Sequence, residues 1–212
     1  MNLALDAVGV TAAVCLASYL MGAIPFGFLA ARVKGIDITK QGSGNTGATN
    51  VFRTLGAAYA IPVLLLDAGK GAFAAYLGLR FLGMGSPGAL LAGACAIAGH
   101  NWSVFLRFRG GKGVATSAGV GFVVFPYLLL AALAVFVVVV AASRYVSLGS
   151  LVAAWTAFLL SFTPSYTTMH RLTVFLLVLA ITVQHRSNIA RLLSGTERRF
   201  GEKVFAGKDE SR

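Results

Sequence analysis

The segment from Gly42 to Arg53 combines three glycines with hydroxyl and amide side chains, a composition suited to binding an anion. Glycines let successive backbone N–H groups turn toward one ligand, and a following helix adds the positive end of its dipole. We therefore predict an anion-binding loop with Arg53 close by. Its candidate residues are Ser43, Gly44, Asn45, Thr46, Gly47, Ala48, Thr49 and Asn50. The glycine spacing also fits a dinucleotide fingerprint, but the loop stands between apolar runs rather than after a strand, which makes that match accidental.

A second segment, Gly99–Gly113, holds three cations and three glycines within its last seven residues. Lys112 is flanked by glycines that leave room for a ligand, so we predict that it binds phosphate. Arg107 and Arg109 fit equally well as anchors at a membrane interface. The spacing differs from that of a P-loop, which argues against a nucleotide triphosphatase. The candidates in this segment are His100, Gly111, Lys112 and Gly113.

Two shorter polar pieces complete the set of candidates. Ser147 lies within the polar stretch Ser143–Ser150, and His185 is followed by Asn188. His185 and Asn188 are three residues apart, so on a continuing helix they share one face. Each piece is weak evidence alone, but four polar clusters that converge on one membrane face would form a site.

Ionisable and sulfur-bearing residues also occur inside apolar runs. Asp67 and Lys70 are one helical turn apart, and we interpret them as a structural ion pair that faces the interior of the bundle, with a functional role as the alternative. Cys15 and Cys95 lie in separate apolar runs. They provide neither a disulfide framework nor a metal cluster, and we expect no metal and no cofactor.

Composition indicates that the bilayer is the solvent of this chain. Of 212 residues, 57% are hydrophobic and only 12% are charged, and the mean hydropathy is +0.79, whereas a soluble domain has about 25% charged residues. The net charge of +11 does not indicate nucleic-acid binding, because the bases lie between apolar runs rather than over a polar face. We expect one transmembrane domain over 1–212, with a short basic tail from about residue 185.

The apolar runs predict the membrane-spanning helices. A span needs about 20 mostly apolar residues. The expected spans are Val8–Ala31, Ala57–Leu79, Ser86–Leu106, Val114–Ser143, Tyr145–Met169 and Leu172–Gln184. The fourth run is interrupted at Pro126, so it is either one long helix or a hairpin of two short helices. The first choice gives six crossings and the second gives seven.

The distribution of bases decides between these counts, because lysine and arginine accumulate on the cytoplasmic side of a membrane. Seven crossings with the N-terminus outside place the C-terminus in the cytoplasm. This topology brings all but three of the 18 lysines and arginines to that side, the exceptions being Lys70, Arg80 and Arg171. Six crossings would put the basic tail outside. We therefore predict an all-α polytopic bundle of seven transmembrane helices.

These motifs resemble a known family. The loop at 42–53, the block at 99–113, and the Ser-Leu-Gly-Ser and His-x-x-Asn pieces are similar to the signature motifs of the bacterial membrane-integral acyl-phosphate:glycerol-3-phosphate acyltransferases. The first two motifs are highly specific, and the resemblance extends from about residue 15 to residue 204.

The resemblance implies transfer of a fatty acyl group from acyl phosphate to the 1-hydroxyl of sn-glycerol 3-phosphate. The products would be lysophosphatidic acid and phosphate, in the first step of phospholipid biosynthesis. It also implies seven helices in the bacterial cytoplasmic (inner) membrane, contact with membrane lipid, and an active site at the cytoplasmic side. Functional coupling to the enzyme that makes acyl phosphate would follow.

On this hypothesis the loop Ser43–Thr49 holds the phosphate of the acyl donor, while Arg53 and Lys112 neutralise phosphate. Ser147, His185 and Asn188 position glycerol 3-phosphate. The proton acceptor is either His185 or the departing phosphate, and the acyl chain lies between helices. The sequence has neither G-x-S-x-G nor a His followed five residues later by Asp, which is the signature of the other acyltransferase family. Acyl phosphate already has a good leaving group, so a covalent enzyme nucleophile is unnecessary.

The competing hypothesis is a transporter or channel for an organic phosphate, since basic motifs also line permeation paths. Transporters usually show inverted repeats and a binding site at the midplane, and this sequence shows neither. A non-catalytic lipid-binding subunit would leave the many phosphate donors unexplained.

Overall fold

The computed structural model describes residues 2–83 and 85–202, and every regular element in them is a helix. The bases of the predicted tail at Lys203, Lys208 and Arg212 lie outside the described residues. The elements in chain order are α1 (Asn2–Ala23), α2 (Phe26–Arg32), η1 (Ile38–Lys40), α3 (Ala48–Leu55), α4 (Ala57–Phe81), α5 (Ser86–Asn101), η2 (Val104–Leu106), α6 (Val114–Val124), α7 (Pro126–Ser143), α8 (Val146–Leu160), α9 (Thr168–Gln184) and α10 (Arg186–Leu193).

Several helices have the length and composition of membrane spans. Four segments qualify among the described residues, namely Asp6–Arg32, α4, Ser86–Leu106 and α7. The pair α9 and α10, bent by 61°, gives a fifth if it is taken as one span, whereas α6 and α8 are apolar but shorter. The prediction of a helical membrane protein is confirmed at this level, and the count of seven crossings stays a prediction.

Prolines divide two of the predicted runs. The run Val8–Ala31 is not one helix, because α1 ends at Ala23 and α2 begins after Pro25. The run Val114–Ser143 is likewise two helices that meet at Phe125 and Pro126. Proline has no N–H to donate and clashes with the preceding turn, so an apolar run that contains it is interrupted.

The run Tyr145–Met169 was predicted as one span, and this boundary is wrong. Helix α8 ends at Leu160, and α9 begins at Thr168, before the predicted start at Leu172. The start of α9 is fixed by a reciprocal cap, in which the Thr167 side chain accepts a hydrogen bond from the His170 N–H, and the His170 ring accepts one from the Thr167 N–H. Such a cap satisfies two backbone donors that the helix leaves unpaired.

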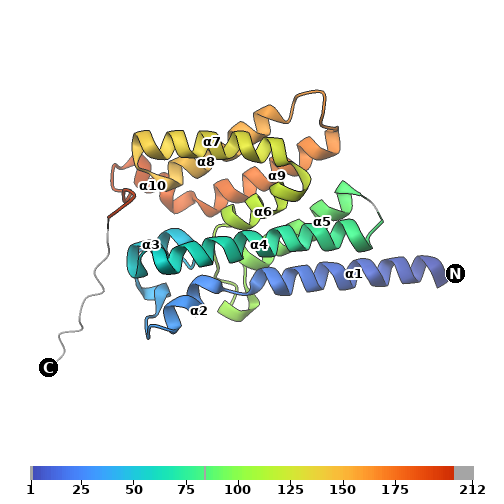
Figure 1. Ribbon diagram of the computed structural model, residues 1–212, viewed down its shortest axis with the longest axis horizontal. Coiled ribbons are helices and arrows are strands. Elements are labelled where there is room, and N and C mark those ends of the chain that lie inside the picture. The colour runs from blue at the N-terminus through green and yellow to red at the C-terminus, as the bar shows by residue number, and fades with distance from the viewer. Residues whose placement is uncertain (1, 84, 203–212) are drawn as a thin grey trace.

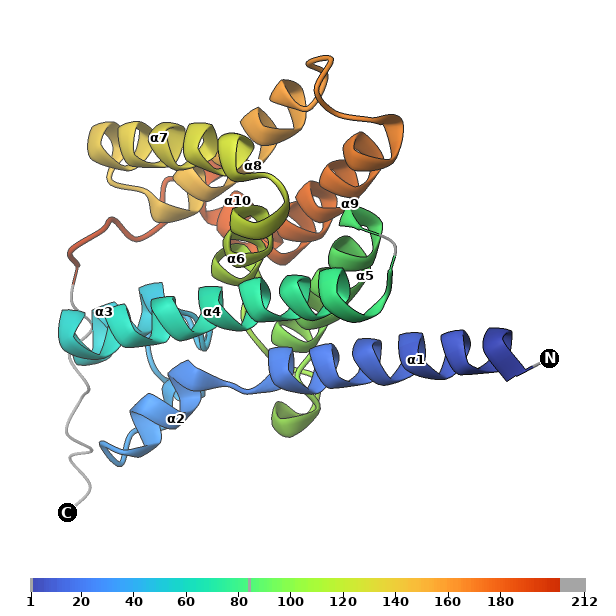
Figure 2. The same ribbon diagram turned by 45° about the vertical axis from the view of Figure 1, so that its right-hand side comes forward.

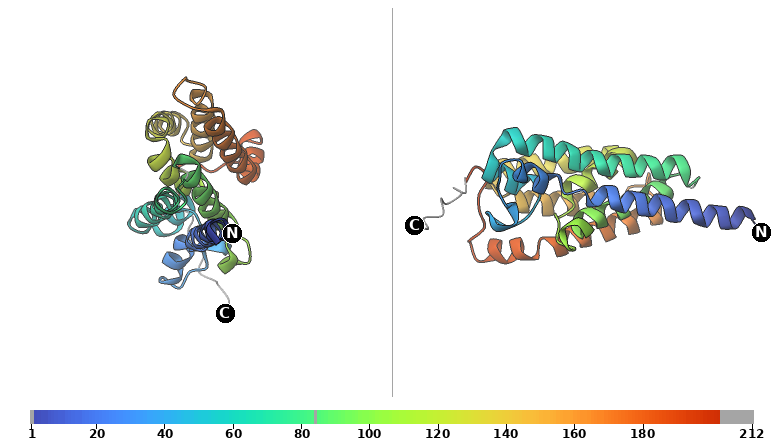
Figure 3. Two further views of the ribbon diagram at one scale, coloured as in Figure 1. Left: turned by 90° about the vertical axis from the view of Figure 1, so that its right-hand side faces the viewer. Right: turned by 90° about the horizontal axis from the view of Figure 1, so that it is seen from below.

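The helices run along the long axis of the molecule, as the end-on view shows (Figure 3). Helices α7, α8 and α9 form one group, α1, α4 and α5 form another, and α6 lies between them (Figure 2). Helices α3 and α10 lie at the same end of the molecule, opposite the first turns of α1 (Figure 1). The segments that hold the first and last of the four motifs therefore lie at one end of the molecule.

The close packing of α4 on α6 depends on two glycines. A Cβ atom at Gly119 would lie 1.8 Å from the carbonyl oxygen of Ala68, and one at Gly71 would lie 2.0 Å from that of Thr116. Small residues allow membrane helices to approach at backbone distance. This contact places the start of α6, which follows Lys112 and Gly113, beside Asp67 on α4.

The segment after α10 turns back across the molecule. Its Phe200 ring stacks on Phe52 of α3 at 4.9 Å between centroids. The N–H of Phe200 donates to the carbonyl oxygen of Arg144 at 2.6 Å, and the Arg144 guanidinium donates to the carbonyl oxygen of Phe200 at 3.0 Å. This returning segment closes one side of the polar end of the bundle.

Candidate active site

A pocket of about 150 Å³ lies where the four sequence motifs meet. It is lined by residues of α3, α4, α5, α6, α7, α8 and α10, of the loops before α3 and α6, of the bend between α9 and α10, and of the segment after α10. The predicted residues that line it are Ser43, Asn45, Gly47, Ala48, Thr49, Asn50, Arg53, His100, Lys112, Gly113, Ser147, His185 and Asn188. The tertiary structure thus brings together motifs that are far apart in sequence, as in the contact between Lys112 and Asn188, which are 76 residues apart.

Three predicted residues lie outside this pocket. Gly44 and Gly111 line an adjoining polar pocket, and Thr46 lines a small cavity beside Asp67 and Lys70. Gly111 packs directly on His100, because a Cβ atom there would lie 1.9 Å from the imidazole Nε2. Its glycine is therefore required by the protein's own packing.

The glycine loop is held by its own asparagines. The Asn50 side chain is fully buried, accepts a hydrogen bond from the Ser43 N–H at 3.1 Å, and donates to the carbonyl oxygens of Gln41 and Asn45 at 3.0 and 2.9 Å. Asn45 accepts from the Gly47 N–H at 2.9 Å. These amides are occupied in shaping the loop. Among the residues that line the pocket, Ser43 and Thr49 carry hydroxyls, and the N–H groups of Ala48 and Thr49 begin α3 and have no partner within that helix.

Lys112 is the cation at the centre of the site, in the loop that precedes α6. Its ammonium donates to the side-chain oxygen of Asn188. Burial lowers the pKa of Lys112 to about 8, and nearby Arg191 and Arg53 act in the same direction while Glu197 opposes them. A desolvated ammonium of this kind interacts strongly with an anion that replaces its lost water.

Arg53 provides a second buried cation, with 8% of its surface exposed. One terminal nitrogen donates to the carbonyl oxygen of Arg198 at 3.0 Å. Its Nε is buried and donates to no atom of the described residues. Burial lowers the pKa of this guanidinium, but arginine remains charged at neutral pH. A buried donor without a partner costs free energy that a bound anion would recover.

Glu197 is the residue to which sequence reasoning gave no role. Only 8% of its surface is exposed. Its Oε1 accepts from the Ser147 hydroxyl at 2.8 Å and from the Asn188 amide at 2.6 Å, and its Oε2 accepts from Arg191 Nε at 2.7 Å. The carboxylate therefore fixes two predicted site residues, and the fixed Asn188 amide turns its oxygen toward Lys112.

The pKa of Glu197 follows from these contacts. Burial alone would raise it, but the hydrogen bonds from Asn188, Ser147 and Arg191 hold it below the ordinary value. The residue is therefore an anion at neutral pH. The only signal in the sequence is an acidic residue among the bases of the tail, two residues after Gly195, which follows the C-cap of α10.

His185 lies at the bend between α9 and α10. Its Nδ1 is 2.8 Å from the carbonyl oxygen of Ile181, a contact in which the ring nitrogen must be the donor. The neutral ring then has an unprotonated Nε2. This nitrogen is the atom of His185 that can accept a proton from, or hold, a ligand in the pocket.

The predicted ion pair in α4 is confirmed. Lys70 Nζ is 2.8 Å from Asp67 Oδ1, and both residues are buried. Lys70 also donates to the carbonyl oxygen of Ile24 at 2.9 Å, where α1 breaks before Pro25. His100 Nδ1 is 3.5 Å from the same Asp67 oxygen. The pair thus joins three helices beside the pocket, and both Asp67 and His100 line the pocket itself.

The remaining arginines of the second motif are exposed and lie apart from this pocket. Arg109 lines the adjoining polar pocket of about 320 Å³, together with Arg186 and Arg191. Arg107 faces a separate groove that contains Arg32. Of the three cations in the segment, only Lys112 lies in the central pocket.

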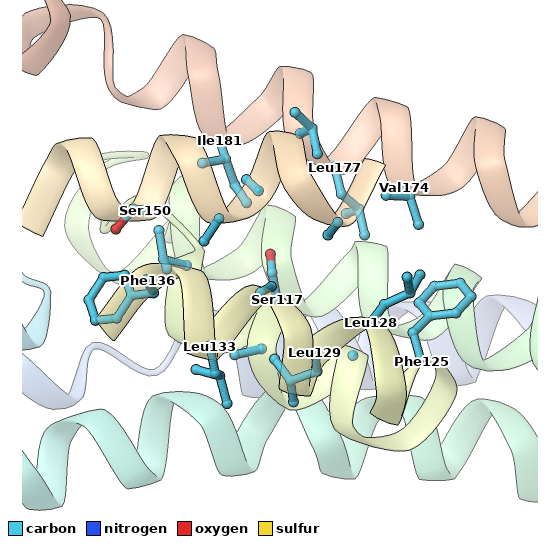
Figure 4. A pocket seen from close by; sticks show the side chains of 18 of the residues that line it. Ser117, Phe125, Leu128, Leu129, Leu133, Phe136, Ser150, Val174, Leu177 and Ile181 are labelled. Carbon is cyan, nitrogen blue, oxygen red and sulfur yellow. The ribbon is translucent and has the colours of Figure 1, made fainter. Parts of the chain in front are cut away.

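An apolar cavity of about 140 Å³ adjoins the polar pocket, and the two share Val114, Phe136 and Ser150. Helices α6, α7, α8 and α9 enclose it, and nearly all of its lining side chains are aliphatic or aromatic (Figure 4). A cationic pocket that opens onto an apolar cavity suits a ligand with a charged head and a long apolar chain.

The fold and the site define an integral membrane protein with a cationic pocket that adjoins an apolar cavity. The chain belongs to the glycerol-3-phosphate acyltransferase family, whose sequence model matches residues 12–195. Its relatives include a glycerol-3-phosphate acyltransferase of Symbiobacterium thermophilum, 46% identical over 191 residues, which are 90% of this chain and 95% of that protein. Glycerol-3-phosphate acyltransferase 1 of Deinococcus radiodurans is 47% identical over 189 residues, which are 89% of this chain and 95% of the relative.

Solved structures agree with this assignment. The chain is similar to crystal structures of PlsY, an integral membrane glycerol 3-phosphate acyltransferase, at 40% sequence identity. The glycerol 3-phosphate form gives a TM-score of 0.85 over 90% of this chain and 96% of that chain. The lysophosphatidic acid form gives 0.83 over 91% and 96%. The resemblance inferred from the motifs is thus confirmed at the level of the family.

Proposed function

We propose that this protein transfers a fatty acyl group from acyl phosphate to the 1-hydroxyl of sn-glycerol 3-phosphate, releasing lysophosphatidic acid and phosphate. The observation that carries the proposal is the direct contact between the cationic pocket and the apolar cavity. Acyl phosphate has both a phosphate head and an apolar chain, and the reacting carbonyl lies where the two meet. The shared residues Val114, Phe136 and Ser150 mark that point.

The reaction needs no covalent enzyme intermediate. The glycerol hydroxyl oxygen attacks the carbonyl carbon and forms the ester bond, while the bond from that carbon to the phosphate oxygen breaks. The electron pair leaves with phosphate, which is already a good leaving group. The hydroxyl proton passes to the departing phosphate, with Nε2 of His185 as the alternative acceptor.

The protein's part is to bind, orient and stabilise charge. The first turn of α3 and the loop before it hold the donor phosphate, and Lys112 and Arg53 neutralise the charge that develops as it leaves. Ser147, Asn188 and His185 orient glycerol 3-phosphate. Glu197 supports this arrangement by fixing Ser147 and Asn188.

We propose seven crossings with the N-terminus outside and the site at the cytoplasmic face of the inner membrane. The basic residues support this orientation, because all but three of the 18 lysines and arginines would lie on the cytoplasmic side. In this topology α6 and α8 are short crossings, and residues 1–212 form one transmembrane domain.

The test is incubation of the purified protein with palmitoyl phosphate and labelled glycerol 3-phosphate, followed by lipid extraction. We expect labelled lysophosphatidic acid and an equal amount of phosphate. The Lys112→Ala variant, purified in the same way, controls for a contaminating acyltransferase. Palmitoyl-CoA should be a poor donor, because the pocket offers no feature for adenine or pantetheine. Equal rates with palmitoyl-CoA would refute the assignment of the glycine loop to acyl phosphate.

A further inference from the structure

The apolar cavity is long and has two different ends. Phe136 and Ser150 lie at the end that adjoins the polar pocket, and Phe125 and Val174 lie at the other (Figure 4). The distance along α7 from Phe125 to Phe136 is about 16 Å at the rise of a helix. A chain that starts at the polar pocket therefore runs toward the ring of Phe125.

The Phe125 ring is held firmly in place. Only 5% of its surface is exposed. The centroid of the Phe125 ring is 5.8 Å from that of Tyr166 and 5.5 Å from that of His170. In both pairs the two ring planes are close to perpendicular. His170 Nε2 is in turn 3.0 Å from the Ser86 hydroxyl at the start of α5, and its Nδ1 takes part in the cap of α9. The ring is thus supported from α5, α9 and the loop before α9.

We propose that Phe125 forms the floor of the acyl-chain site and sets the longest chain that the site accepts. This inference rests on the proposed function, since it needs an acyl donor in the cavity. Each methylene buried before the chain reaches the ring raises affinity by about fourfold. A further methylene must displace a buried ring that packs against Tyr166 and His170, and overfilling a close-packed interior is unfavourable.

Gly121, which also lines the cavity, offers the opposite change. A Cβ atom at this position would meet Leu129 at 3.7 Å or more, which is an ordinary contact, and no backbone atom lies closer. A Cβ atom therefore fits at this position, and the rest of a larger side chain would occupy space in the cavity that Gly121 lines. Gly121→Leu should shorten the space that Phe125→Ala lengthens.

Phe122 provides a matched control on the same helix. Its side chain is 69% exposed, and it does not line the cavity. Phe122→Ala removes the same atoms as Phe125→Ala but leaves the cavity unchanged. Phe125→Leu serves as a milder variant if the alanine variant does not yield folded protein.

The experiment measures kcat/KM of the purified full-length protein for saturated acyl phosphates from decanoyl to stearoyl. Each variant is compared with wild type at every chain length, so that partition of the donor into detergent cancels. We expect the stearoyl to myristoyl ratio to rise in Phe125→Ala, by about fourfold for each methylene accommodated. The ratio should fall in Gly121→Leu and stay at the wild-type value in Phe122→Ala.

The outcomes separate this inference from the proposed function. If wild type transfers acyl groups from acyl phosphates, and both cavity variants have the wild-type stearoyl to myristoyl ratio, then Phe125 is not the floor of the chain site. The proposed acyltransferase function would stand in that case. An equal change of the ratio in Phe122→Ala would also show that Phe125 is not the floor. Absence of transfer from any acyl phosphate by wild type overturns both.

Discussion

The carboxylate of Glu197 should be required for the site although it contacts no proposed reacting atom. Glu197→Gln keeps the shape of the side chain but removes its charge and replaces one acceptor oxygen with a donor. The amide cannot accept from Ser147, Asn188 and Arg191 together, as the carboxylate does. Without this anchor the Asn188 amide is free to turn over and present its nitrogen to Lys112.

The size of the effect follows from the hydrogen bonds lost. A hydrogen bond to a charged group contributes about 1.5–3 kcal/mol, so loss of one that positions Asn188 should lower kcat/KM by about 10- to 150-fold. Glu197 also raises the pKa of Lys112, against the larger effect of burial. Removal of its charge should therefore move the pH at which Lys112 loses its proton below the wild-type value of about 8.

The assay is a pH profile of kcat/KM for wild type, Glu197→Gln and the exposed tail control Glu202→Gln, at matched monodispersity in detergent. We expect Glu197→Gln to have a lower kcat/KM than wild type and a descending limb that begins at a lower pH. Glu202→Gln should match wild type in both respects. A thermal scan checks that the protein is folded. Wild-type activity with an unshifted limb would refute the positioning role. A loss of activity without any shift would reduce Glu197 to a packing residue.

Three further predictions concern the cations and the topology. Lys112→Ala and Arg53→Ala should fold normally but lose about 30- to 1000-fold in kcat/KM, as expected for about 2–4 kcal/mol of charge stabilisation, whereas exposed Arg107→Ala should retain most activity. Wild-type kcat/KM should fall as pH rises above about 8, where Lys112 loses its proton, and Lys112→Arg should lack this limb. The contribution of Lys112 to the free energy of unfolding should change with pH in the opposite direction. Because the pKa of Lys112 is lower in the folded than in the unfolded protein, this contribution should increase as pH rises from the folded-state pKa to the unfolded-state pKa. A cysteine replacing exposed Ser194 should react with an impermeant maleimide only from the cytoplasmic side.

Each of these has a contrary result. Near-normal kinetics in both alanine variants would remove Lys112 and Arg53 from the site. A flat profile up to pH 10 would show that no group with the pKa of Lys112 controls the reaction. Labelling of position 194 from the periplasmic side in intact cells would reverse the proposed topology.

The sequence predicted the helical membrane class and most of the pocket, because both depend on local composition. Long apolar runs identify helices in a bilayer, since hydrophobic length alone decides whether a segment can span it. Glycines beside hydroxyls and cations identify anion sites, because that chemistry is carried by neighbouring residues. The predicted breaks were less accurate. Helix α2 begins after Pro25, and α9 begins after its cap residue Thr167. Both positions lie inside runs that were predicted as single spans from their apolar composition.

The tertiary structure decided what joins residues far apart in the chain. Glu197 could not be assigned from sequence, because its role comes from Ser147 on α8 and Asn188 on α10 meeting one carboxylate. The floor at Phe125 likewise depends on Tyr166 and His170 from a distant loop and helix. The type of a residue and its neighbours in sequence indicate which chemistry it can carry out. Which partners it meets is fixed only when the helices pack, because the packing brings buried polar groups and rings from separate segments within contact distance.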